Sequence, residues 1–134
     1  MPESIRALFS IVGRLCLITI FLMSALGNKI PKYTEVSGKM ETVGVPVPQV
    51  SLALAIVFLV LGSIMVLVGY WARIGAVLLA VFLVLATFYF HPFWDTPGDE
   101  NQMAHFMKNL GLLGAMLFII ANGSGAGSLD ARKK

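Results

Sequence analysis

Residues 49–90 read QVSLALAIVFLVLGSIMVLVGYWARIGAVLLAVFLVLATFYF and carry a single charged side chain, Arg73. Arg73 divides this stretch into two apolar runs. Each run is long enough to cross a bilayer, because a spanning helix takes about 20 residues. Further apolar stretches occupy residues 10–30 and 109–129. We therefore predict an integral membrane protein with four spans, at about residues 5–26, 49–70, 74–90 and 105–121.

The composition limits what else the chain can contain. Of its 134 residues, 57% are hydrophobic and 13% are charged, which is typical of a small polytopic membrane protein. We expect a single domain, residues 1–134, with no soluble domain beside the spans. The net charge of +3 is scattered along the chain, so no basic face for nucleic acid is predicted. Phosphate loops, nucleophile elbows and HExxH motifs are missing, so we expect no catalytic activity from the isolated chain.

The connections predict how the spans are arranged. The connections after spans two and three are short, so consecutive spans should pack antiparallel. The predicted fold is an all-α four-helix bundle with up-down spans, and residues 27–47 form a polar loop. Helices approach each other closely in lipid where residues are small. The small residues expected at helix contacts are Gly62, Ser63, Gly69, Gly75, Ala76, Gly111, Gly114 and Ala115.

Lysine and arginine residues predict the orientation in the membrane. An even number of spans places both termini on one side, which then carries Arg6, Arg14, Arg73, Arg132, Lys133 and Lys134. The opposite side carries Lys29, Lys32, Lys39 and Lys108. Cytoplasmic loops hold the larger share of basic residues. We therefore expect cytoplasmic N- and C-termini and the plasma membrane as location.

Arg14 lies well inside the first predicted span, where an unpaired charge is costly. One interpretation is a structural ion pair with Asp130, which the preceding glycine run allows to fold back. Arg73 on the same side competes for Asp130. The alternatives are that Arg14 extends to the headgroups, because long side chains can do so, or that it contacts a ligand.

A second polar group gathers at the opposite membrane face. Lys29, His91 and Asn109 are our candidate ligand-binding residues, because a few convergent polar groups beside apolar surface are typical of a small-molecule site. A quinone headgroup or an anion would suit such donors. The alternative is the ordinary polarity of a membrane interface. Two histidines without characteristic spacing do not predict a metal site, and no cofactor is evident.

Cys16 is the single cysteine of the chain. It therefore excludes an intramolecular disulfide or a CxxC redox pair. Free cysteines usually behave as small buried apolar residues. We expect Cys16 to be buried within the bundle.

Several short motifs taken together resemble the DoxX family of small four-span membrane proteins. They are Gly13-Arg14-Leu15, Ser24-x-x-Gly27-x-Lys29, the sequence of Gly62, Gly69 and Arg73, then His91, and finally Gly125-Ala126-Gly127-Ser128-Leu129-Asp130. Their order covers nearly the whole chain. One departure is that residues 57–61 contain no glutamate, where many members of the family have one.

The resemblance implies a bacterial inner-membrane protein and leaves two functional hypotheses. In the first, the chain is a non-catalytic or accessory component that packs with partner proteins, with further copies of itself, or with lipid. In the second, it is a membrane subunit of a quinone-linked oxidoreductase of the thiosulfate:quinone type, with a polar site near the quinone. The resemblance implies this role because some relatives have it. The missing glutamate argues against any function that depends on that carboxylate.

Overall fold

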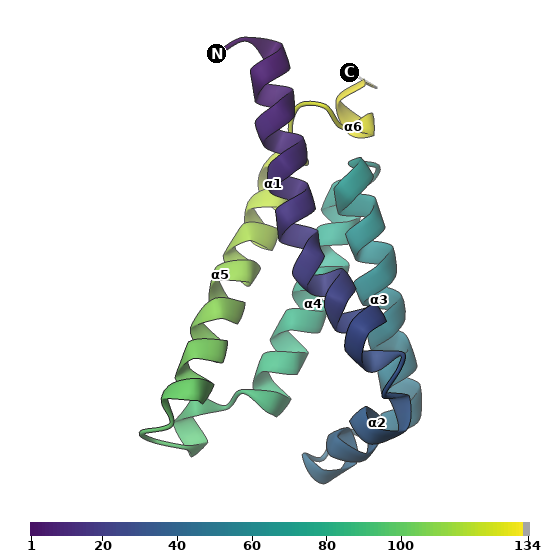
Figure 1. Cartoon of the computed structure of the whole chain (residues 1–134), viewed down its shortest axis with the longest axis vertical. Coiled ribbons are helices and arrows are strands. Elements are labelled where there is room, and N and C mark those ends of the chain that lie inside the picture. Colours follow the sequence, from purple (N-terminus) through teal and green to yellow (C-terminus); the bar gives the residue numbers. More distant parts are fainter. Residues whose placement is uncertain (133–134) are drawn as a thin grey trace.

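The computed structural model describes residues 1–132, which contain helices and no strand. Four helices are long and apolar enough to cross a membrane: α1 (Glu3–Ser24) with its π-helical continuation η1 (Ala25–Lys29), α3 (Pro48–Val68), α4 (Ala72–Phe90) and α5 (Glu100–Asn122). Shorter elements are α2 (Tyr33–Thr42), the 3₁₀ turn η2 (Phe93–Asp95) and α6 (Leu129–Arg132). The all-α bundle of four antiparallel spans is thus confirmed (Figure 1).

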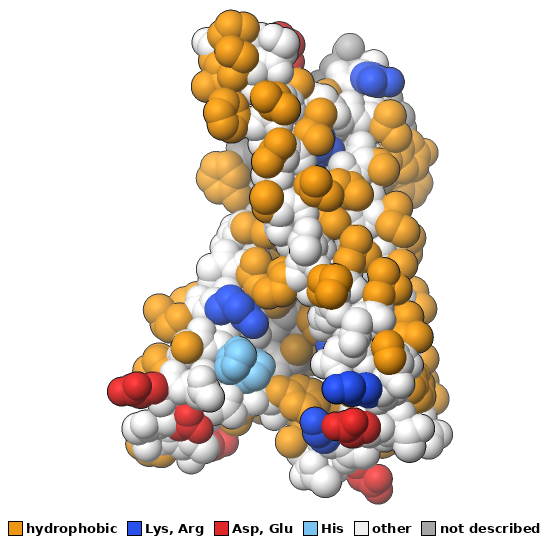
Figure 2. Space-filling model, viewed as in Figure 1, with side chains coloured by type: hydrophobic (Ala, Val, Ile, Leu, Met, Phe, Trp, Pro, Cys, Tyr) orange, Lys and Arg blue, Asp and Glu red, His pale blue; other side chains and the backbone are white. Residues whose placement is uncertain are grey.

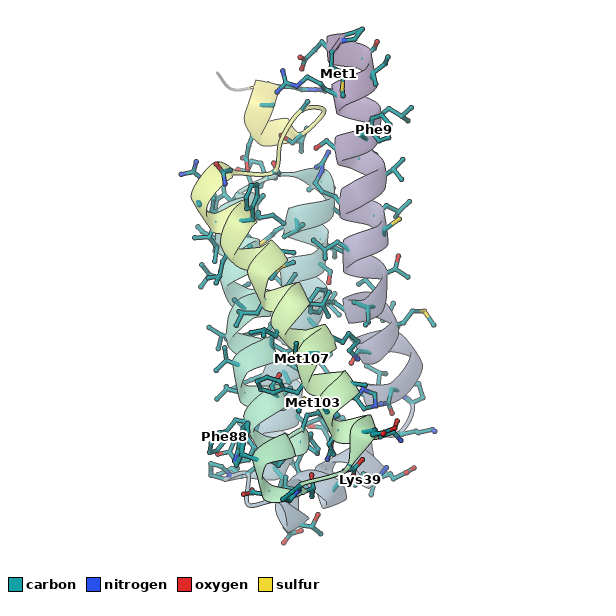
Figure 3. All side chains as sticks on the ribbon, turned by 90° about the vertical axis from the view of Figure 1, so that its left-hand side faces the viewer. Met1, Phe9, Lys39, Phe88, Met103 and Met107 are labelled. Carbon is teal, nitrogen blue, oxygen red and sulfur yellow. The ribbon has the colours of Figure 1, made fainter. Side chains whose placement is uncertain are left out.

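Large apolar side chains cover the outside of the four long helices. Phe9 is 66% exposed and Phe88 is 60% exposed, and both point away from the bundle (Figure 3). An apolar surface of this extent is not found on a soluble monomer. It is the surface that a bilayer covers. Cys16 is also exposed, so the prediction that it is buried was wrong, because it lies on the lipid-facing side of α1.

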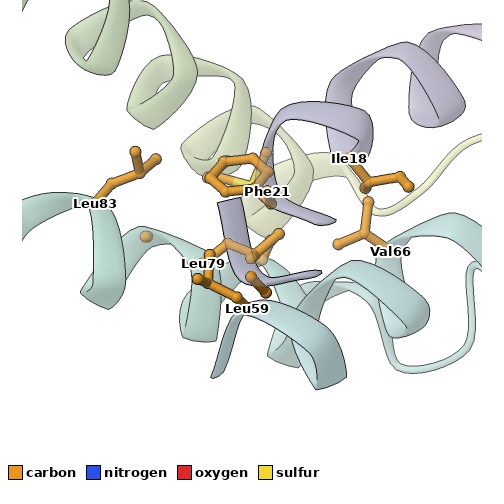
Figure 4. Close-up of a cluster of buried hydrophobic side chains, with 10 residues drawn as sticks. Ile18, Phe21, Leu59, Val66, Leu79 and Leu83 are labelled. Atoms are coloured by element: carbon orange, nitrogen blue, oxygen red, sulfur yellow. The ribbon is translucent and has the colours of Figure 1, made fainter. Parts of the chain in front are cut away.

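The core is built where α1, α3, α4 and α5 meet. Ile18 and Phe21 of α1 lie against Val66 of α3 and against Leu79 and Leu83 of α4 (Figure 4). These side chains are at most 3% exposed. They therefore define the inner face of each span.

Helices α3 and α4 cross at two glycines, as predicted. A Cβ atom added at Gly62 would lie 2.8 Å from the carbonyl oxygen of Gly75, and one added at Gly75 would lie 2.9 Å from that of Gly62. Gly111 and Gly114 of α5 are different, because nothing lies within 4 Å of an added Cβ at either position. The prediction that this second pair marks a helix contact was wrong.

The segment between the first two spans is more ordered than the predicted polar loop. The first span continues as η1 to Lys29, and α2 follows and packs on α3. Ser37 and Met40 of α2 are buried, and the hydroxyl of Tyr33 donates to the carbonyl of Gln49. The prediction of an irregular loop over residues 27–47 is therefore corrected. The α2 helix is stabilised by its packing on α3, which the local sequence of residues 33–42 does not predict.

The bundle is closed at one end and open at the other. Both termini lie at the closed end, where α1 approaches α5 (Figure 1). From there α1 packs chiefly on α3 and α5 packs on α4. The two helices therefore diverge toward the end that carries α2 and η2 (Figure 1). This divergence positions the polar residues described next.

Candidate functional site

Lys29 is placed by the π-helix η1. Its Nζ donates to the hydroxyl of Ser24 at 2.6 Å and lies 5.2 Å from the centre of the Phe82 ring on α4. Lys29 follows Ser24 by five positions, with four residues between them. A π-turn adds a residue to the helical turn and often marks a functional site. Lys29 is only half-buried, so its ammonium group lies against the bundle and still reaches the surface.

His91 lies on the other side of the open end, between α4 and α5. Its Nδ1 is 2.8 Å from the side-chain oxygen of Gln102, and the amide of Gln102 donates to the carbonyl of Phe90 at 3.1 Å. The ring of His91 stacks on that of His105, with 4.7 Å between the ring centres. Gln102 and His105 thus hold the His91 ring between the two helices.

Asn109 continues this polar contact one helical turn deeper. Its side-chain amide donates to the hydroxyl of Thr87 at 3.0 Å, and Asn109 is 8% exposed. The backbone N–H of His91 in turn donates to the carbonyl of Thr87. We call these five residues, Thr87, His91, Gln102, His105 and Asn109, the α4–α5 seam.

A hollow separates the seam from Lys29. Figure 2 shows the surface hollowed between the end of α5 and the end formed by η1 and α2. Lys29 belongs to one of these ends and the seam to the other, and its hydrogen bond and ring contact are with Ser24 and Phe82 rather than with the seam. A separate open pocket of about 550 Å³ lies at the α4–α5 connection, lined by residues such as Trp94, Pro97 and Met103. It contains none of the three predicted residues.

The donors at the open end suit hydrogen bonding better than metal coordination. Among residues 1–132, no group of three His, Cys, Asp or Glu side chains converges. The seam offers imidazole nitrogens and amide groups, and η1 offers an ammonium group. Such groups bind a polar headgroup by donating hydrogen bonds.

Arg14 lies at the closed end and binds carbonyl groups. Its guanidinium donates to Leu67 at 2.9 Å, to Gly127 at 3.1 Å and to Ser10 at 3.3 Å, with a longer contact to Val66. Arg14 is 5% exposed. It therefore ties α1 to the end of α3 and to the C-terminal tail.

Asp130 reaches the same end from the tail. Its carboxylate accepts bonds from the backbone N–H groups of Trp71 and Ala72, both at 3.0 Å, while its own N–H donates to the carbonyl of Gly69 at 2.7 Å. It thereby caps the N-terminus of α4. We call the contacts of Arg14 and Asp130 the tail junction.

The direct ion pair between Arg14 and Asp130 stays a prediction. Two ion pairs between described residues are those of Arg6 with Glu3 and of Lys39 with Glu35. Arg14 meets carbonyl groups, and the partners that hold Asp130 include two N–H groups. Arg73, the predicted competitor, is exposed near Gly123. The folding back of the tail, however, is as predicted.

The structure therefore brings His91 and Asn109 into one seam and places Lys29 on the facing wall. Sequence reasoning missed Phe82, Thr87 and Gln102, and it noted Ser24 only within the family motif that ends at Lys29. The contact of Thr87 with Asn109 could have been predicted from the sequence. A hydroxyl group in an apolar span needs a hydrogen-bond partner, and Asn109 lies at a similar depth in the next span. Phe82 carried no such signal, because its contact with Lys29 depends on the η1 geometry.

Known proteins resemble this chain over most of its length. The DoxX family model matches residues 9–92. Inner membrane protein YphA of Escherichia coli K12 is 30% identical over 132 residues, which cover 95% of this chain and 91% of that protein. Inner membrane protein YqjF of the same organism is 32% identical over 120 residues, with 90% and 88% covered.

A more distant similarity involves a eukaryotic protein. The Surfeit locus protein 4 homolog of Schizosaccharomyces pombe is 26% identical over 135 residues, which cover 96% of this chain and 39% of that protein. No solved structure gives a significant match.

Proposed function

The chain belongs to the DoxX family, and we propose that it is a non-catalytic component of the bacterial inner membrane that holds a lipid molecule in the hollow at its open end. The observation that carries the proposal is the pair of polar walls, Lys29 on one side and the α4–α5 seam on the other, at the end of an otherwise apolar bundle. The packing of the chain with partner proteins or with further copies of itself stays a prediction.

The geometry supports a lipid because both parts of such a molecule find a matching surface. Partly buried apolar side chains of α1 and α5 pack on the core and leave part of their surface exposed, among them Leu17, Leu22, Leu112 and Leu113. They suit an acyl chain. The hollow lies at the ends of the spans, where lipid headgroups are found, and it offers hydrogen-bond donors there.

A quinone is the second candidate. The observation that favours it is the His91 ring, which Gln102 and His105 fix in place. A fixed ring nitrogen can donate to a quinone carbonyl in the tautomer that carries the proton there. In that case the chain would serve as the membrane subunit of a redox complex.

Mass spectrometry of the purified protein tests the two candidates together. The protein is washed extensively in mild detergent, and retained lipid and quinone are extracted and quantified. We expect about one retained lipid per chain in the wild type. Asn109→Leu should lower retention at least threefold, because an apolar side chain removes the amide from the seam.

Asn101→Leu is the matched control, because Asn101 lies on the same helix and is exposed. It should leave retention unchanged. Retained quinone in place of lipid would favour the redox alternative. Equal retention in the Asn109 and Asn101 variants would contradict a site at the seam.

A further inference from the structure

Lys29 is a half-buried cation whose described contacts are neutral. It uses one donor on the Ser24 hydroxyl and lies over the face of Phe82, while an ammonium group carries three donors. Neither ion pair among residues 1–132 includes Lys29. A cation partly removed from water is costly without an anion. The ammonium group of Lys29 therefore has N–H donors left that can bind an anionic group.

The open end has no acid in an ion pair with Lys29 among the described residues. Its five acids are all exposed: Glu35, Glu41, Asp95, Asp99 and Glu100. Glu35 pairs with Lys39, and Asp99 accepts from the N–H groups that begin α5. Lys108, by contrast, is a cationic side chain on the end of α5 that borders the hollow. The potential inside should be positive.

We propose that the hollow selects a phospholipid with a net negative headgroup, of the phosphatidylglycerol type. Its phosphate accepts a charge-assisted hydrogen bond from the ammonium group of Lys29, a bond stronger than one between neutral groups. A phosphatidylethanolamine headgroup would bring a second ammonium group beside Lys29. No carboxylate among the described residues forms an ion pair with Lys29, so none is placed beside it to receive that group.

This inference rests on the proposed lipid site and adds its selectivity. The test loads the delipidated protein with equal amounts of phosphatidylglycerol and phosphatidylethanolamine of identical acyl chains, and native mass spectrometry gives the ratio of the bound species. We expect the wild type to favour phosphatidylglycerol about tenfold. Lys29→Met, which keeps the apolar stem without the charge, should reduce that preference to about twofold or less.

Two variants separate a specific site from general attraction. Lys32→Met removes an exposed charge three residues away and should leave the preference intact, and Lys29→Arg should retain most of it. An equal loss in the Lys29→Met and Lys32→Met variants would show nonspecific surface attraction and overturn the assignment.

The failure of this inference is distinguishable from failure of the proposed function. If lipid binds with no preference in the wild type, the hollow holds a lipid but does not select its charge. If no lipid binds above the level of an unrelated four-span protein, the lipid site itself is wrong. If Lys29→Met does not fold, the preference for phosphatidylglycerol in the wild type, in Lys29→Arg and in Lys32→Met still tests the inference. Loss of this preference in Lys29→Arg and in Lys32→Met alike would contradict it.

Discussion

Trp71 has a backbone conformation that needs support. Its φ of 49° and ψ of 42° are left-handed, which costs a residue with a side chain about 1–2 kcal/mol. The Asp130 carboxylate binds the N–H groups of Trp71 and of Ala72, the first residue of α4. A negative charge at a helix N-terminus is also favourable. A residue from the end of the chain thus supplies the cap that the local sequence lacks.

Arg14 and Asp130 should be energetically coupled, because both hold the tail against the ends of α3 and α4. Asp130→Ala should lower the free energy of unfolding by about 1–2 kcal/mol, the usual cost of a lost cap. Arg14→Ala should cost about 2–4 kcal/mol, since it leaves buried carbonyls unsatisfied. The double variant should cost at least about 0.5 kcal/mol less than the sum.

Reversible unfolding in mixed micelles measures all three variants. Arg6→Ala is the control, because Arg6 pairs with Glu3 on the exposed start of α1 and exposed ion pairs contribute little. Strict additivity of the Arg14 and Asp130 variants would show that the two residues act independently.

At the scale of the elements, the crossing of α3 and α4 depends on two backbones in contact. An alanine at Gly62 or Gly75 would bring its Cβ within 3 Å of the opposite carbonyl oxygen. The helices would have to move apart and lose packing around Leu79. We expect Gly62→Ala and Gly75→Ala each to lower the free energy of unfolding by about 1–3 kcal/mol, as overpacking does.

Gly111→Ala provides the matched comparison within the same bundle. An added Cβ there meets nothing within 4 Å, and alanine favours a helix over glycine by up to about 1 kcal/mol. Thermal unfolding in detergent should therefore show a neutral or stabilised Gly111→Ala variant. Destabilisation equal to that of Gly62→Ala would mean that α5 buries this face against something else, such as a second copy.

The contrast between these glycines explains what the sequence could predict. The four spans follow from length and composition, because a bilayer demands about 20 apolar residues whatever the packing. Which face of α5 turns inward is set by tertiary contacts, and apolar residues surround that helix on every side. Gly62 and Gly111 therefore looked equivalent in sequence, and only the structure separates them.

For the candidate site, as for the spans, the sequence predicts which residues take part but not which side chains they contact. Lys29, His91 and Asn109 stood out because polar side chains are rare near apolar spans. Their depth was predictable from position along the helix, but their neighbours were not. The π-turn at η1 shifts Lys29 by one residue relative to a regular helix, and this shift determines that Ser24 and Phe82 become its contacts.

At the scale of the whole molecule, the two ends of the bundle differ in construction. The tail junction closes one end by hydrogen bonds between segments that are far apart in sequence. At the other end the hydrogen bonds of the seam join α4 to α5, whereas α1 and α5 diverge (Figure 1). A molecule entering from the lipid would therefore meet an opening at one membrane face only. Which face that is depends on the orientation of the chain.

Single-cysteine labelling determines that orientation. The background is Cys16→Ser, because Cys16 is exposed to lipid. Glu41 and Asp99 lie at the open end and Glu3 lies at the closed end, and all three are exposed. With six basic residues at the terminal side against four, the termini should be cytoplasmic.

A membrane-impermeant maleimide should then label Glu41→Cys and Asp99→Cys in intact spheroplasts, and Glu3→Cys only after permeabilisation. The opposite pattern would place the hollow in the cytoplasmic leaflet, and labelling of Glu41→Cys and Asp99→Cys from different sides would contradict the four-span topology itself.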